Sequence, residues 1–131
     1  MSPESLLFTP THEWVAVEKT PSGEIATVGI SDFAVQALTD LVFLQLPAAG
    51  AKVEAGRPFG EVESVKAVND LYSPVTGTVV EANSPLVNDL EQISRDPFGA
   101  GWLIKVKLDG PLPSDLLDYN AYRQQCASDE H

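Results

Sequence analysis

A lysine in the middle of one strand–turn–strand segment constrains this chain more than any other feature. The segment covers residues 60–77, and Lys66 is its only basic residue. A two-residue turn at Lys66 and Ala67 would bring the flanking residues into antiparallel register, with apolar residues facing apolar ones. The pairs in that register are Val65 with Val68, Ser64 with Asn69, Glu63 with Asp70 and Val62 with Leu71. We therefore predict a β-hairpin with Lys66 at its tip.

The residue types around this tip favour a function for the lysine side chain. Neither Lys66 nor Ala67 favours the positive φ that two-residue hairpin turns require, so a turn kept without Gly or Asn suggests that its side chain is needed. A lysine at a hairpin tip is most often only a solvated charge. Here acidic residues flank it on both arms, at Glu61, Glu63 and Asp70. This setting indicates a site of chemistry.

The segment around this lysine resembles the lipoyl-attachment hairpin of the glycine cleavage system H-protein family. The resemblance is most specific over residues 63–67 and 70–77, and it extends from about Phe8 to about Tyr122. Other matching strings are His12-Glu13-Trp14-Val15, Gly29-Ile30-Ser31-Asp32 and Asp96-Pro97-Phe98-Gly99-x-Gly101-Trp102. The resemblance implies a mainly β fold, a flattened β-sandwich or hybrid barrel of the lipoyl and biotinyl type, with short helices and a C-terminal helix.

Local patterns give more detailed expectations for this fold. The apolar run over residues 41–46 is short enough to predict a strand buried on both faces. Residues 31–38 predict a short helix that starts at Ser31 and packs on the core without binding anything. A terminal helix over residues 115–125 is expected to begin after a cap at Ser114.

Length and charge limit the class of protein. A chain of 131 residues predicts a single domain over residues 1–131, with its core over about 8–122. The formal net charge of −11 opposes binding to nucleic acid and weakens attraction to anionic membranes. No apolar run approaches the roughly 20 residues of a membrane span. Basic partner proteins match this charge better than nucleic acid or a membrane.

The few reactive side chains argue against an independent enzyme. Cys126 is the only cysteine, which indicates a reducing compartment. His12 and His131 are the only histidines, so the sequence predicts no metal site and no nucleophile–base pair. Residues 1–5 lack the basic region of a secretory signal and the arginines of a transit peptide. We expect a bacterial-type cytoplasmic protein, or a mitochondrial matrix protein if a transit peptide has been removed.

The family resemblance implies a carrier that takes its chemistry from a cofactor. In the family the lysine is joined to lipoic acid by an amide bond, which implies a covalent lipoyl group on Lys66. Such a carrier shuttles an aminomethyl group from a pyridoxal-phosphate glycine decarboxylase to a folate-dependent aminomethyltransferase, and passes electrons to dihydrolipoamide dehydrogenase. Lipoylating enzymes are further partners implied by the resemblance, and we expect the carrier to be a monomer.

The resemblance also implies residues that hold the loaded arm. The family uses an acidic residue after the first histidine and another four residues beyond the lysine, which correspond to Glu13 and Asp70, and Thr11 is a candidate hydroxyl partner. The competing interpretation is that Glu13 only caps or solvates a sheet edge. Some family members have a histidine in the helix after Gly29-Ile30, where this chain has Ala37, so no such contact is expected from that position.

Four other functions compete with that of a carrier in glycine cleavage. An H-like protein that only relays lipoate to other enzymes fits the same residues. A biotinyl domain is disfavoured because Val65 and Ala67 replace the methionines that flank the lysine in that group. An adaptor domain that has lost its modification is disfavoured because Lys66 is kept inside the full motif. An independent enzyme fits least well.

Overall fold

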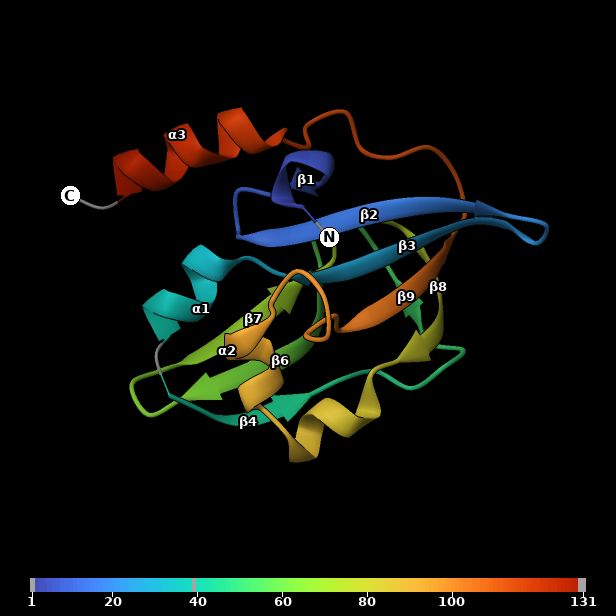
Figure 1. Ribbon diagram of the computed structural model, residues 1–131. Helices are drawn as coiled ribbons and strands as arrows, with labels where there is room; N and C mark the ends of the chain where they lie inside the picture. The colour runs from blue at the N-terminus through green and yellow to red at the C-terminus, as the bar shows by residue number, and fades with distance from the viewer. Residues whose placement is uncertain (1, 39, 130–131) are drawn as a thin grey trace.

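The computed structural model describes residues 2–38 and 40–129, which form two antiparallel β-sheets (Figure 1). The larger sheet contains, in spatial order, β1 (Leu7–Phe8), β2 (Glu13–Thr20), β3 (Gly23–Ile30), β9 (Ile104–Leu108), β8 (Gly77–Ala82) and β5 (Lys52–Val53). The smaller sheet contains β4 (Leu41–Gln45), β6 (Pro58–Ser64) and β7 (Val68–Tyr72). The two sheets form the two layers of the fold (Figure 1).

Helices are short and lie at the edges of these layers. They are the 3-10 helices η1 (Pro3–Ser5) and η2 (Ser84–Asn88) and the α-helices α1 (Asp32–Leu38), α2 (Glu91–Arg95) and α3 (Tyr119–Asp129). Helix α3 lies along β1 and β2, away from the smaller sheet (Figure 1). The predicted mainly β sandwich with short helices and a C-terminal helix is confirmed. Within the described ranges, none of the helices combines the length and apolar character needed to cross a bilayer.

The β2–β3 hairpin is fixed by a large ring packed on a glycine. Trp14 is fully buried, and its Nε1 donates a hydrogen bond to the carbonyl oxygen of Pro97 at 2.9 Å. Gly29 lies directly opposite Trp14 in the ladder, where an added Cβ would come within 2.5 Å of the indole ring. Only glycine leaves room for the ring at this position. This packing fixes the start of β2, where Glu13 lies, two residues after Thr11.

The C-terminal helix docks through one tyrosine. The Tyr122 ring stacks on Phe8 with ring centroids 4.4 Å apart, and both side chains are buried. The helix starts at Tyr119, and Asp118 rather than Ser114 caps it, because Asp118 Oδ1 accepts the Ala121 N–H at 2.8 Å. The predicted start is therefore wrong by four residues. The chain before the helix instead forms a turn at Ser114 and Asp115, and Leu117 then pairs with Phe8 in an isolated bridge.

Strand β4 departs from the prediction that it is buried on both faces. Leu44 is buried, but Val42 and Phe43 are exposed by 55% and 42%. The cause is a β-bulge, since the register against β6 shifts between Leu41 and Phe43. A bulge adds one residue to a strand and interrupts the alternation of side chains between its faces. Two consecutive apolar side chains therefore face solvent, which an apolar run in the sequence cannot reveal.

The hairpin of β6 and β7 forms as predicted, but its register is different. Glu63 lies opposite Val68, and Glu61 lies opposite Asp70. The predicted pairing of Glu63 with Asp70 is therefore wrong, and the connection is longer than two residues. The turn of this hairpin projects from the end of the sandwich that also holds α1 (Figure 1).

Candidate functional site

The turn that carries Lys66 is held by one serine. Ser64 Oγ accepts hydrogen bonds from the backbone N–H groups of Lys66 and Ala67, both at 3.2 Å. The Ser64 N–H donates to the carbonyl oxygen of Ala67 at 2.9 Å, and the Val65 N–H donates to that of Asp40 at 3.0 Å. Neither turn residue takes a positive φ. The longer, serine-closed turn thus explains how a hairpin without Gly or Asn can form here.

The Lys66 side chain is exposed at this turn. It forms no ion pair with a carboxylate of the described residues, although Glu63 and Asp70 lie on the adjoining strands. The backbone below it is ordered by the Ser64 contacts while the amine stays open to solvent. This arrangement presents a primary amine to an enzyme at a defined position.

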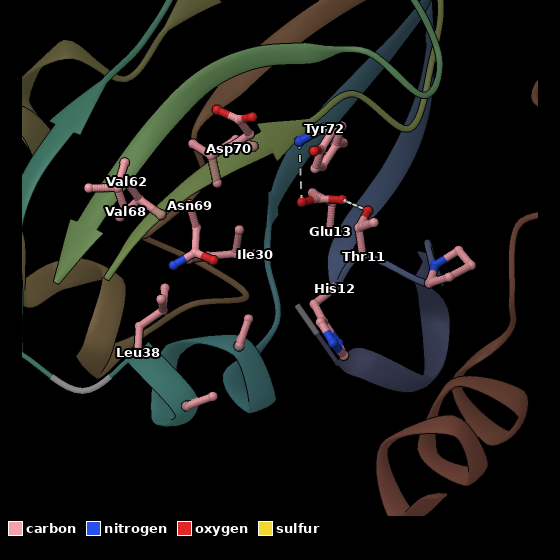
Figure 2. A pocket seen from close by; sticks show the side chains of 14 residues that line it. Thr11, His12, Glu13, Ile30, Leu38, Val62, Val68, Asn69, Asp70 and Tyr72 are labelled. Atoms are coloured by element: carbon pink, nitrogen blue, oxygen red, sulfur yellow. Dashed lines mark hydrogen bonds between the residues drawn. The ribbon is translucent and has the colours of Figure 1, made fainter. Parts of the chain in front are cut away.

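A cavity of about 570 Å³ opens beside the hairpin, between β7, the start of β2 and helix α1 (Figure 2). Its lining combines apolar side chains with a few polar ones. The lining residues are Pro10, Thr11, His12, Glu13, Ile30, Ala34, Ala37, Leu38, Val62, Val68, Asn69, Asp70, Leu71 and Tyr72. Four separate stretches of the chain therefore build one concave site.

Glu13 is the only acidic side chain in the buried core of the described residues, with 2% of its surface exposed. Thr9 Oγ1 donates a hydrogen bond to Glu13 Oε1 at 2.8 Å, and Thr11 Oγ1 donates to the same oxygen. The backbone N–H of Tyr72 donates to Oε2 at 3.3 Å (Figure 2). Since Tyr72 belongs to β7, the carboxylate links the larger sheet to the smaller one.

Burial gives this carboxyl group an unusual acidity. Loss of hydration raises the pKa of Glu13 from 4.5 to about 7, while the hydrogen bonds from Thr11, Thr9 and the Tyr72 amide act in the opposite direction. Glu13 is therefore divided between its charged and neutral forms near pH 7. A cation that entered the cavity would favour the charged form.

His12, one of the residues that line the cavity, is tied to the C-terminal helix. His12 has a positive φ of 79°, an uncommon backbone conformation for a residue with a side chain. Its Nδ1 lies 2.8 Å from the Tyr122 hydroxyl, which also lies 2.5 Å from Ser31 Oγ at the start of α1. Burial raises the pKa of Tyr122, so its hydroxyl keeps its proton and can donate. This network joins α1, α3 and the loop before β2.

Comparison with known proteins identifies a family for this geometry. The family model described as glycine cleavage H-protein matches residues 6–129. The chain belongs to the glycine cleavage H-protein family. The glycine cleavage system H protein of Rhodopirellula baltica is 49% identical over 125 residues, covering 95% of each chain, and that of Rubrobacter xylanophilus is 47% identical, covering 98% of this chain and 97% of the relative.

A solved structure supports the same membership. The crystal structure of a glycine cleavage system H protein from Mycobacterium marinum superposes with a TM-score of 0.87 and 43% sequence identity, and covers 96% of this chain and 99% of that one. The family resemblance predicted from the sequence is thus confirmed. Members of the H-protein family are carriers rather than enzymes and hold a lipoate covalently on a lysine.

The structure brings three of the four predicted site residues together. Thr11, Glu13 and Asp70 all line the cavity, whereas Lys66 lies outside it on the turn. The side chains of Asn69 and Asp70 leave β7 in opposite directions, and it is Asn69 that points toward Ile30 (Figure 2). Asp70 therefore lies at the rim, and Asn69 is a cavity residue that the sequence did not indicate.

Two further features of the site were missed or misassigned from the sequence. Helix α1 was predicted only to pack on the core, but Ala34, Ala37 and Leu38 form one wall of the cavity. Thr9 is a further residue of the site, and nothing in the sequence around it indicates its contact with Glu13. Among the described residues, no cluster of His, Cys, Asp or Glu could hold a metal ion.

Proposed function

We propose that the protein is the lipoyl carrier of a glycine cleavage system, with lipoate joined by an amide bond to Nζ of Lys66. The observation that carries the proposal is an exposed lysine on a turn ordered by Ser64, in a chain that belongs to the H-protein family. An amine attacks an activated acyl group only when it is neutral. We therefore assign the activation of this amine to the lipoylating enzyme.

The cavity fits the group that this lysine would carry. When bound, lipoate supplies a dithiolane that accepts a carbon group and two electrons at its sulfur atoms. Ile30, Leu38 and Leu71 give the cavity an apolar wall suited to a hydrocarbon arm. We propose that Glu13, with Thr11, accepts hydrogen bonds from a primary ammonium group at the end of that arm, and that Asp70 adds a carboxylate at the rim.

The partners follow from the proposed role. We propose a pyridoxal-phosphate glycine decarboxylase, a folate-dependent aminomethyltransferase, dihydrolipoamide dehydrogenase and a lipoylating enzyme, which the chain would meet as a monomer in the bacterial cytoplasm. The net charge of −11 suits brief encounters with several enzymes that present basic surfaces. The single cysteine agrees with a reducing compartment.

Glycine-dependent release of carbon dioxide in a reconstituted system tests the proposal. The lipoylated wild-type chain should support turnover, and Lys66→Arg, which keeps the positive charge but is not acylated, should give none. Lys52→Arg is the matched control, because Lys52 is also exposed, and it should stay within about twofold of wild type. Turnover by Lys66→Arg would overturn the proposal, and a lipoylated wild-type chain that supports no turnover would favour a lipoate relay.

A further inference from the structure

A patch of exposed apolar side chains lies next to the lysine turn. It consists of Val42, Phe43, Val65 and Val68, which are exposed by 55%, 42%, 65% and 60% and which we call the tip patch. Phe43 lies opposite Glu63, and Glu63 lies opposite Val68, so these three side chains form one row on the outer face of the smaller sheet. Val68 also borders the Glu13 cavity, whereas Val42, Phe43 and Val65 do not line it.

The β4 bulge is the structural cause of the patch. Leu41 and Leu44 are more buried than the two residues between them, and the shift in register places Val42 and Phe43 outside together. An ordinary strand would turn one of these side chains into the core. Bulges commonly redirect side chains beside functional sites. In a chain with a net charge of −11, the bulge therefore exposes the aromatic ring of Phe43 to solvent near Lys66, the residue proposed to react.

Acidic residues continue the same face behind the apolar row. Glu61 lies directly opposite Asp70 in the ladder, although like charges in that arrangement are destabilising. Within residues 2–38 and 40–129, neither carboxylate forms a salt bridge. Lys66 is the only basic residue between Arg57 and Arg95. The face therefore has an apolar centre and an acidic margin, which complements a partner with an apolar centre and a basic margin.

From this arrangement we infer that the tip patch is the docking surface for the enzyme that acylates Lys66. The inference rests on the proposed attachment of lipoate to Lys66. The atom that reacts in acylation is the lysine Nζ itself, so the acylating enzyme must contact surface within one side-chain length of the turn. Enzymes that act at the far end of a lipoyl arm have no such requirement. The surface that an acylating enzyme must touch is therefore the surface where the bulge exposes apolar side chains.

The kinetics of lipoate transfer by a lipoate–protein ligase with ATP test the inference. The double variant Val42→Thr and Phe43→Thr keeps residues that favour strands, and so does Val65→Thr, at a patch residue that does not line the cavity. Each should raise the KM for the chain about tenfold or more while kcat stays within about twofold. The reason is that the substitutions weaken binding to the ligase and leave the acyl-transfer step unchanged. Reaction of Lys66 with a small acylating ester should be unchanged, which shows that the amine itself is intact.

Val80→Thr is the matched control. Val80 is exposed by 45% and also occupies a bulge, between Val79 and Glu81 in β8, which lies at the opposite end of the molecule (Figure 1). Its KM should stay within about twofold of wild type. Equal KM values for the tip-patch variants and Val80→Thr would overturn the inference.

Two further outcomes separate this inference from the proposed function. Tip-patch variants that are lipoylated normally, but fail with the glycine-cleavage enzymes once fully lipoylated, would assign the patch to those enzymes and overturn the present assignment. A wild-type chain that the ligase leaves unmodified, while it modifies a known lipoyl domain, would overturn the proposed function itself and the docking surface with it.

Discussion

The Lys66 turn and the Glu13 cavity are two regions built in different ways. The turn is local, since its hydrogen bonds join residues within four positions of one another, apart from the contact of Val65 with Asp40. The cavity is assembled from stretches far apart in the chain, and Glu13 reaches Tyr72 across the gap between the sheets. The comparison shows that a short motif is enough to present the lysine for attachment of the cofactor. A cavity that binds the attached arm depends on the whole fold.

The largest expected effect separates reactivity from stability at the turn. Lys66→Arg should abolish lipoylation and glycine turnover, yet change the free energy of unfolding by less than about 0.5 kcal/mol because the side chain is exposed. Urea unfolding and mass spectrometry on the same sample measure both. A large loss of stability would show that the turn is part of the structural core, and would contradict the distinction between a local turn and a cavity that depends on the whole fold.

Glu13→Gln should have the opposite character, with a large effect on stability and no effect on attachment. Between pH 4.5 and about 7 the folded protein holds a proton on Glu13 that the unfolded chain has lost, so this group makes stability fall as pH rises through that window. Above pH 7 the neutral glutamine should make the protein more stable by as much as about 3 kcal/mol. Urea unfolding from pH 4.5 to 8 measures the difference, which should vanish at the acidic end.

The same titration should control the hold on an ammonium group. Because the charged form of Glu13 rises from about one tenth at pH 6 to about nine tenths at pH 8, binding of the ammonium should strengthen about tenfold over that range. The lifetime of the loaded arm, followed by mass spectrometry in wild type and Glu13→Gln, reports it. A lifetime that does not depend on pH, or that Gln leaves unchanged, would return Glu13 to a structural role.

Thr9→Val should produce a smaller change inside the cavity. Thr9 Oγ1 donates to Glu13 Oε1 and accepts the Glu13 backbone N–H at 3.1 Å, so its loss leaves a buried donor without a partner and costs about 2 kcal/mol. The Glu13 pKa, measured by NMR, should rise further. Thr11→Val is the control at an exposed residue and should raise the same pKa with less loss of stability. Equal losses in the two variants would contradict this assignment.

Ser64→Ala should have the smallest effect on stability. It removes the acceptor of the Lys66 and Ala67 amides, which water can replace at this exposed turn, so the cost is about 1 kcal/mol. Lipoylation should slow severalfold, since the lysine is presented from a looser turn. An unchanged rate of lipoylation would show that order at the turn does not matter to the enzyme.

Sequence reasoning worked best where the determining contacts are local. The β6–β7 hairpin and the Ser31 start of α1 follow from the alternation of side chains and from the chemistry of the helix cap. It failed at the register of the lysine hairpin, because hydrogen bonds to the Ser64 side chain lengthen the turn. Residue preferences for positive φ give no indication of these hydrogen bonds.

The rest of the site depends on tertiary structure. The burial expected for β4 was wrong because a bulge, set by its pairing with β6, exposes Val42 and Phe43. The wall made by α1 was missed because the helix touches the cavity only once β7 lies opposite it. The meeting of Thr11, Glu13 and Asp70 was predicted from family resemblance, since Glu13 and Asp70 are 57 positions apart and no pattern links them.

The position of the lipoyl group is the measurement that tests the account most directly. The purified chain is incubated with lipoate, ATP and a lipoate–protein ligase, and its intact and peptide masses are then determined. The account predicts a single lipoyl increment, located on the peptide that contains Lys66. No increment under conditions that modify a known acceptor, or an increment on Lys19, Lys52, Lys105 or Lys107, would contradict it.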